Sequence, residues 1–146
     1  MELEKYLLQS DEEQEVFEFY SQGPNGNILK KVVYVPTTTQ HVWQLVMGDY
    51  NLDTGHIDFL KVTNNNDTDK ILATVGVTLY SFFSKKPNSL VYAKGSTNSR
   101  TRLYQIGISQ LYEQIEEDFE VFGELEGKYE RFTKNINYNS FIVTKK

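Results

Sequence analysis

The stretch from residue 16 to residue 36, VFEFYSQGPNGNILKKVVYVP, decides the fold class. Phe17 and Phe19 alternate with Glu18, which is the period-two pattern of a half-buried strand. The cluster GPNGN favours a tight turn, and a second β-prone run occupies residues 28–35 before a proline ends it. Two such runs joined by a short turn predict a β-hairpin, and therefore antiparallel pairing.

Two helices and further strands are predicted along the rest of the chain. Apolar residues recur at helical spacing in residues 69–84 and again in residues 100–118, which indicates two amphipathic helices. Because the strands come as hairpins, we expect an α+β fold with a mostly antiparallel sheet of about six or seven strands and two main helices packed on one face. Further strands are predicted at 42–51, 56–63, 90–95, 120–127 and 139–146, and the placement of residues 118–132 stays open.

Length and composition limit the classes of protein to which this chain can belong. A chain of 146 residues suits a single domain, and residues 1–14 are expected to form a polar lead-in to it. The absence of cysteine excludes disulfides, thiolate zinc sites and cysteine nucleophiles, and it is typical of a reducing compartment. The acidic N-terminal residues contain no long apolar run, so neither a signal peptide nor a membrane span is predicted. The sequence therefore predicts a cytoplasmic protein without a membrane partner.

The charges are distributed unevenly along the chain. The net charge is −5, yet the stretch from Lys70 to Tyr112 contains six basic residues and no Asp or Glu. The other nine basic and 20 acidic residues give the remainder a net charge of −11. Overall acidity argues against indiscriminate nucleic-acid binding, whereas the basic middle allows a local anion site.

One candidate for that anion site is the run YAKGSTNSRTRLYQIGIS, residues 92–109. Two arginines lie where a strand should give way to a helix, although a helix N-terminus disfavours cations and attracts anions. Together with nearby hydroxyls, they predict a site for a phosphate, a carboxylate or a stacked base. In the structural alternative, one arginine pairs with a carboxylate and Ser99 or Thr97 caps the helix. The predicted anion-binding residues are Lys94, Ser96, Thr97, Ser99, Arg100, Arg102 and Tyr104.

Other patterns give weaker indications of chemistry. The run DYNLDTG, residues 49–55, is similar to a calcium loop, but its glycine is one place late and the twelfth position is Leu60 instead of glutamate. His41 and His56 are the only histidines, and neither lies in a motif with metal-ligand spacing. We therefore predict no metal, no cofactor and no catalytic residue.

Three stretches together resemble a family of small uncharacterised bacterial proteins of about this length. They are GDYNLDTGHIDFLKVTNNNDTDKILATV (48–75), GSTNSRTRLYQIGIS (95–109) and FEVFGE (119–124), and the family shares a GST…RTRLY run. The resemblance covers roughly residues 17–143. It implies a class of protein and no activity, since no function is established for that family.

These observations favour a binding module over an enzyme, because no nucleophile, base and oxyanion site can be recognised together. The first expectation is a phosphate-bearing ligand or single-stranded nucleic acid held by residues 96–102, in a protein that could form a homodimer. The second is a protein–protein adaptor or regulatory subunit that presents an acidic face or a sheet edge. The third is an enzyme acting on a phosphorylated small molecule.

Overall fold

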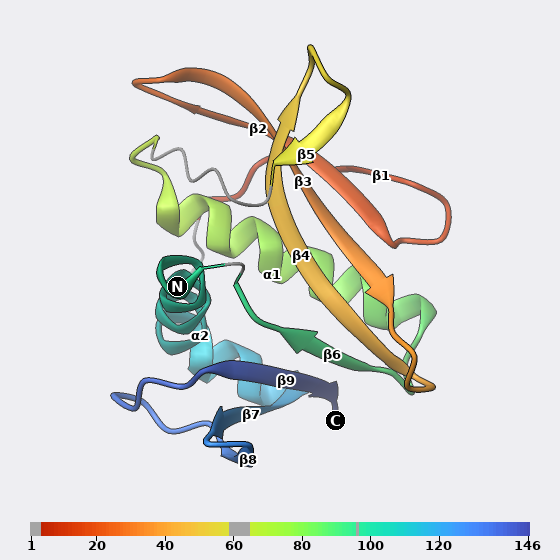
Figure 1. Cartoon of the computed structure of the whole chain (residues 1–146), viewed down its shortest axis with the longest axis vertical. Coiled ribbons are helices and arrows are strands. Elements are labelled where there is room, and N and C mark those ends of the chain that lie inside the picture. Colours follow the sequence, from red (N-terminus) through yellow and green to blue (C-terminus); the bar gives the residue numbers. More distant parts are fainter. Residues whose placement is uncertain (1–3, 59–64, 96) are drawn as a thin grey trace. The chain divides into compact units, whose positions relative to one another are not determined.

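The computed structural model describes residues 4–58, 65–95 and 97–146 of the chain. Within these residues the protein has two helices and a mostly antiparallel sheet, which confirms the predicted α+β class (Figure 1). The helices are α1 (Thr68–Lys85) and α2 (Asn98–Asp118). The strands are β1 (Gln9–Ser10), β2 (Val16–Gly23), β3 (Gly26–Pro36), β4 (Val42–Asn51), β5 (His56–Asp58), β6 (Leu90–Ala93), β7 (Phe119–Leu125), β8 (Lys128–Arg131) and β9 (Ser140–Lys145).

The strands are hydrogen-bonded in the order β1-β2-β3-β4-β6-β9-β7-β8, and β5 pairs with β4. The β4–β6 pair is parallel, with Val42 opposite Leu90, and the chain between these strands includes α1, as a parallel pair requires a long connection. The nine described strands exceed the six or seven predicted. The additional ones, β1 and β8, have two and four residues, too few to show an alternating pattern. Residues 59–63, which complete the predicted strand 56–63, lie outside the described residues.

The chain divides into two compact units. Unit 1 comprises residues 1–33 and 46–85, and unit 2 comprises residues 34–45 and 86–146. Helix α1 belongs to unit 1 and α2 to unit 2, while β3 and β4 contribute residues to both. A single domain over 1–146, and two helices on one face of the sheet, stay predictions.

Both predicted helices are confirmed. Helix α1 starts one residue before the predicted stretch 69–84, and α2 starts two residues before the predicted stretch 100–118. The apolar stripe of α1 gives a buried face, as its spacing predicts. Neither of the helices that the structure describes is both long and apolar enough to cross a lipid bilayer. The buried residues of α1 are Leu72, Ala73, Thr74, Val75, Thr78, Phe82 and Phe83.

Unit 1 contains the predicted hairpin of β2 and β3. Val16 lies opposite Val33, and Gly23 lies opposite Gly26 across the turn. The backbone of Gly26 has φ +85°, a conformation that glycine adopts without steric strain. The turn cluster in the sequence therefore sets the register of the hairpin.

A buried ion pair links β3 and β4 in unit 1. Lys30 Nζ lies 2.5 Å from Asp49 Oδ1, and the two side chains are only 7% and 9% exposed. Burial strongly disfavours an isolated charge, so each of these side chains depends on the other for compensation. Asp49 is the first residue of the calcium-like run, and its carboxylate forms an ion pair with Lys30.

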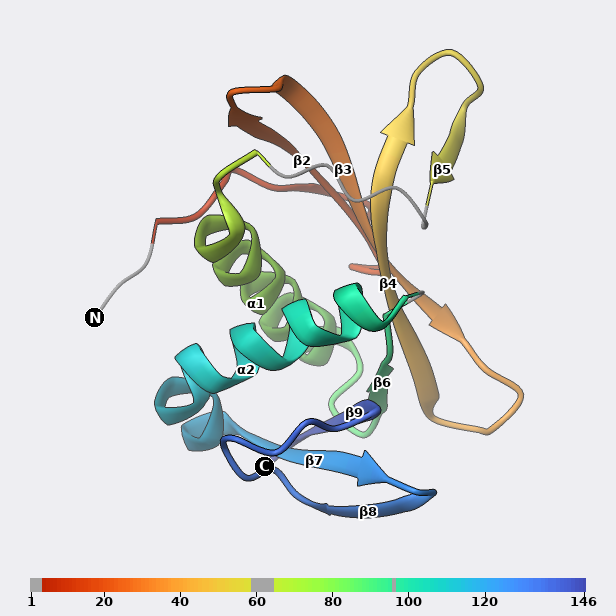
Figure 2. The same cartoon turned by 60° about the vertical axis from the view of Figure 1, so that its left-hand side comes forward.

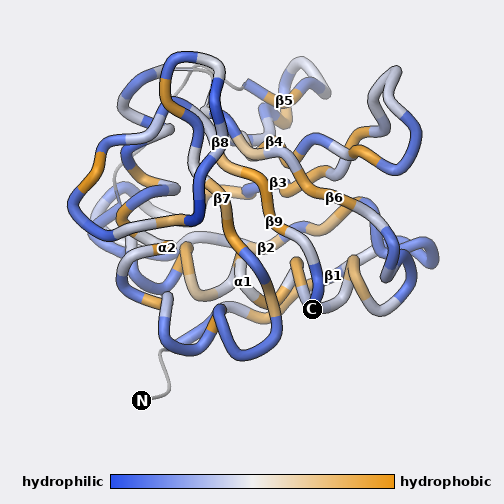
Figure 3. Tube along the Cα trace, turned by 90° about the horizontal axis from the view of Figure 1, so that it is seen from below, coloured by the Kyte–Doolittle hydropathy of each residue, from blue (hydrophilic) through white to orange (hydrophobic). Residues whose placement is uncertain are grey.

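Unit 2 is centred on β6, β9 and β7, whose apolar positions are visible in Figure 3. Residues 118–132, which the sequence left open, form the end of α2 and the β7–β8 hairpin (Figure 2). Tyr138 has no exposed surface, and its ring lies 5.6 Å from that of Phe132 and 6.1 Å from that of Phe141, centroid to centroid. The same ring packs flat on Gly123, where any side chain would overlap it.

Candidate functional site

Gly95 and Thr97, which precede α2, are hydrogen-bonded to residues in its first turn. Gly95 N donates to Thr101 Oγ1 at 3.1 Å, and the Thr101 hydroxyl donates to Thr97 O at 3.2 Å. Thr97 is the N-cap of α2, because its side chain accepts a hydrogen bond from Arg100 N at 3.2 Å. A Cβ at position 95 would overlap Arg100 Cβ and Thr101 N, so the close approach requires glycine. Thr97 therefore caps the helix, as the structural alternative predicts.

Arg102 anchors α2 to the segment before β9. Its Nη1 donates to Gln105 Oε1 at 2.7 Å, and its Nη2 donates to Tyr138 O at 3.0 Å. Gln105 Oε1 also accepts from Tyr138 N at 2.9 Å, and Gln105 Nε2 donates to Ile136 O. Arg100 is buried, with 6% of its surface exposed. Both arginines are thus part of the packing of unit 2, and the described partners of Arg102 are an amide and a carbonyl, in place of the predicted carboxylate.

We expect Arg102→Ala to lower the free energy of unfolding by about 2 kcal/mol, because it removes two charge-assisted hydrogen bonds from a partly exposed group. Arg102→Lys should lower the free energy of unfolding by less, because lysine keeps the positive charge although it cannot donate two parallel hydrogen bonds as the guanidinium does. Urea unfolding followed by circular dichroism measures both. Unchanged stability in Arg102→Ala, together with lost binding of a phosphorylated ligand, would instead support the predicted anion site.

Tyr104 lies two residues after Arg102 on α2. Tyr104 is buried on α2, and this burial raises the pKa of its phenol to about 12, although the charge of Arg100 acts in the opposite direction. A buried phenol that keeps its proton does not offer a charged group to a ligand. Tyr104 is therefore a core residue of unit 2.

Alkaline pH should destabilise unit 2 through Tyr104. The unfolded chain releases this proton near pH 10 and the folded chain near pH 12, so the stability due to Tyr104 is complete below pH 10 and is lost between pH 10 and 12. The loss of stability amounts to about 3 kcal/mol. Urea unfolding of the wild type and Tyr104→Phe at pH 9 and pH 12 measures it. An equal alkaline loss in the two proteins would contradict the assignment.

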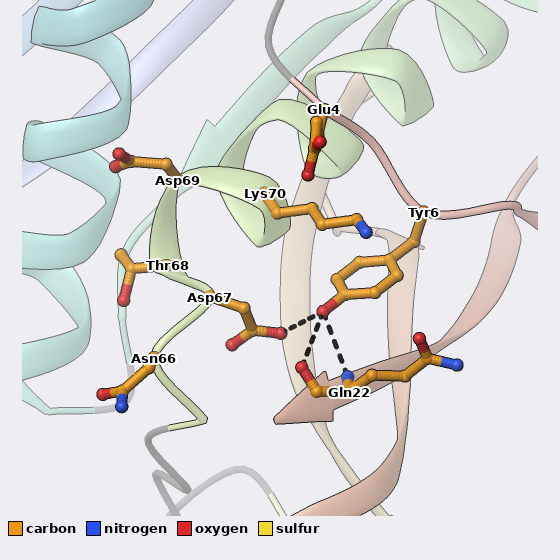
Figure 4. A pocket seen from close by; sticks show the side chains of 8 residues that line it. All are labelled: Glu4, Tyr6, Gln22, Asn66, Asp67, Thr68, Asp69 and Lys70. Atoms are coloured by element: carbon orange, nitrogen blue, oxygen red, sulfur yellow. Dashed lines mark hydrogen bonds between the residues drawn. The ribbon is translucent and has the colours of Figure 1, made fainter. Parts of the chain in front are cut away.

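A polar pocket of about 740 Å³ lies in unit 1 at the start of α1 (Figure 4). Its walls come from the N-terminal segment, the end of β2, and the loop and first turn of α1. Three of the lining side chains are acidic, one is basic and one is aromatic, so the pocket offers several modes of ligand recognition. The lining residues are Glu4, Tyr6, Gln22, Asn66, Asp67, Thr68, Asp69 and Lys70.

Tyr6 is held in this pocket by both its backbone and its ring. Tyr6 N donates to Thr74 Oγ1 on α1 at 2.9 Å, and the ring stacks on Phe19 with centroids 5.5 Å apart. The hydroxyl donates to Asp67 Oδ2 at 2.5 Å and accepts from Gln22 N at 3.0 Å. Burial, and then the hydrogen bond to Asp67, raise the pKa of the Tyr6 phenol. The N-terminal segment is therefore attached to both α1 and β2.

A second layer of polar side chains supports Asp67. Ser21 Oγ donates to Asp67 Oδ2 at 2.5 Å, and Asn65 Nδ2 donates to Ser21 Oγ at 3.1 Å. Asn65, which is 1% exposed, also donates to Gly26 O at 2.9 Å. This chain of hydrogen bonds connects the carboxylate to the β2–β3 turn. It fixes the position of one acidic wall of the pocket.

Lys70 supplies the basic group. Its ammonium lies over the Tyr6 ring, 4.3 Å from the centroid. Figure 4 shows the Glu4 side chain directed toward Lys70, while Asp69 points away from Tyr6. With three carboxylates and one ammonium, the wall of the pocket has a formal charge of −2.

The comparisons with known proteins identify the family. The sequence matches the model of a family of unknown function (DUF6934) over residues 2–146. The chain belongs to this family. Neither a search of curated proteins nor a search of solved structures returned a match. The predicted resemblance to a family without an established function is confirmed. In this DUF6934 member, a functional site is therefore assigned from the geometry of the structure.

The predicted anion-binding residues of this family member differ in their surroundings. Lys94 and Ser99 are exposed, whereas Arg100 and Tyr104 are buried. Ser96 lies outside the described residues. Binding of an anion here stays a prediction, and the exposed side chains that could contact it are those of Lys94 and Ser99.

Histidines and the calcium-like loop take no part in a metal cluster among the residues described. Over 4–58, 65–95 and 97–146, no three His, Cys, Asp or Glu side chains are placed to hold a metal ion. In the loop, Asn51 Oδ1 accepts from Asp53 N at 2.9 Å and from Thr54 N at 3.2 Å, which is the geometry of a side-chain-stabilised turn. Asn51 therefore stabilises the β4–β5 connection.

The pocket includes residues that the sequence did not single out. Tyr6 lies within the predicted polar lead-in, and Asp67 lies two residues before the first predicted helix. The one available signal was an aromatic residue in an acidic, largely polar segment. Its contacts to Thr74 and Asp67, more than 60 residues away in sequence, could not be anticipated from local pattern.

Proposed function

We propose that this protein is a binding module for a polar small molecule and that the pocket of unit 1 holds the ligand. The observation that supports this most strongly is the convergence of the Tyr6 ring, the carboxylates of Glu4 and Asp67 and the Lys70 ammonium on one pocket of about 740 Å³ (Figure 4). Pockets of this size fit small ligands, and a few fixed polar groups provide orientation. The hydrogen bonds that hold Tyr6 and Asp67 mean that these groups are positioned before a ligand arrives.

The test is a titration of ¹⁵N-labelled protein with a library of small polar molecules, both charged and neutral. We expect at least one compound to change the amide shifts of Tyr6, Gln22 and Lys70 in a saturable way. A variant that changes one lining group, Asp67→Asn, should weaken that effect, and a matched change outside the pocket, Asp53→Asn, should not. If no compound in the library shifts the lining amides, the proposed function is wrong.

The same titration addresses the other predicted functions. Phosphorylated compounds and single-stranded oligonucleotides that shift Lys94 and Ser99 would favour the anion-binding function. An adaptor or regulatory subunit should respond to neither set and should instead be recovered with a protein partner. If the protein converts a phosphorylated compound into a product during the titration, the third expectation, an enzyme, is supported.

A further inference from the structure

We infer that the pocket of unit 1 binds an organic cation whose ammonium or guanidinium group takes the place of the Lys70 ammonium over the Tyr6 ring. This inference rests on the proposed function, because it names the ligand class of the same pocket. Tyr6 already holds a cation on its ring, 4.3 Å from the centroid. The aromatic face is therefore accessible to an ammonium group in the folded protein.

The charges of the pocket favour a cationic ligand. Glu4, Asp67 and Asp69 bring three negative charges to its wall, and Lys70 compensates for one of them. An aromatic face attracts ammonium ligands, and a carboxylate beside it adds coulombic attraction. The hydroxyls and amides of the lining, such as Gln22, can bind the polar end of such a molecule.

An anion would be the alternative ligand, since the pocket adjoins the N-terminus of α1. The partial positive charge at a helix N-terminus attracts anions. Here, however, Asp69 lies in the first turn and Asp67 directly precedes the helix. These two carboxylates already offset the positive end, so a further anion would meet like charges.

Displacing Lys70 should require little free energy. A single cation–aromatic contact at a site that water still reaches is weak, and a lysine side chain that leaves the ring regains rotamer freedom in water. A ligand cation that makes the same ring contact and also lies near Asp67 can therefore replace it. Lys70 then acts as an internal competitor for the ligand.

The experiment compares three four-carbon probes that differ in charge: 1,4-diaminobutane, 1,4-butanediol and succinate. Binding is followed through the amide shifts of the lining residues. We expect the diamine to bind most tightly and succinate most weakly. Lys70→Ala should tighten diamine binding by about two- to fivefold, because the competing cation is removed. Lys85→Ala, in the last turn of the same helix and outside the pocket, should leave it unchanged.

Ring variants separate recognition from folding. Tyr6→Phe keeps the ring and should retain diamine binding, whereas Tyr6→Leu should weaken it by about two- to fivefold. Both variants are checked for an unchanged fold by their amide spectra. If Tyr6→Leu does not fold, the comparison of wild type with Lys70→Ala decides the question.

The two proposals fail in different ways. Tighter binding of succinate than of the diamine, or weaker diamine binding in Lys70→Ala, would overturn the cation inference and leave the pocket as a binding site. If none of the three probes shifts the lining amides, the cation inference is also wrong. The proposed function fails only when the whole library leaves those amides unchanged.

Discussion

Replacing Asp49 with alanine should lower the free energy of unfolding by about 3–5 kcal/mol, because it leaves the Lys30 ammonium buried without its carboxylate. Lys30 is only 6% exposed, so water cannot replace the lost partner without opening the strands. The measurement is urea unfolding at pH 7, followed by far-ultraviolet circular dichroism. We expect the midpoint to fall while the slope, which reflects exposed surface, stays the same.

Two controls distinguish burial from charge as the cause. Lys31, next in the chain, lies 3.5 Å from Glu18 in a partly exposed pair, so Glu18→Ala should cost less than about 1 kcal/mol. The double variant Lys30→Met/Asp49→Leu removes both charges and should be close to the wild type in stability. A small loss in Asp49→Ala, similar to that of Glu18→Ala, would contradict the role assigned to burial.

The ion pair also shows what sequence could and could not predict about the fold. The alternation in β2 and the turn cluster were sufficient to predict the hairpin, and apolar spacing was sufficient for both helices. In the run ILKKVVYV, however, nothing local distinguishes a lysine that is 6% exposed from its partly exposed neighbour. That difference depends on which residue of β4 faces each lysine, and such pairings are long-range.

For the candidate sites, too, the sequence predicts local structure and does not predict long-range partners. The sequence placed Arg100 and Arg102 near the start of a helix, and the position was right. Their partners could not be predicted, because Arg102 reaches the carbonyl of Tyr138, 36 residues later. A basic side chain at a helix N-terminus is unfavourable only in the absence of such acceptors. The pocket was missed for a similar reason, since Tyr6 meets Asp67 only after the chain has folded.

Gly123→Ala should destabilise unit 2 by about 3 kcal/mol. A methyl group at position 123 would overlap Cγ, Cδ1 and Cδ2 of the Tyr138 ring. Adding atoms to a well-packed core usually costs about 1–3 kcal/mol, and the upper end applies when the neighbour cannot move. Tyr138 has no exposed surface, and its hydroxyl donates to Glu130 Oε2 at 2.9 Å and accepts from Thr133 N at 3.1 Å. The ring is therefore fixed at both ends.

A double-mutant cycle tests whether the overlap is the cause. Tyr138→Ala alone should cost about 3–5 kcal/mol, because it removes a buried aromatic ring and leaves a cavity. In that background Gly123→Ala should cost much less than in the wild type, because its methyl group enters the vacated space. The coupling between the two changes should then exceed about 1 kcal/mol, as expected for residues in direct contact. Additive losses would show that alanine at position 123 acts through the strand backbone, and the packing of Tyr138 on Gly123 would no longer explain why glycine is required.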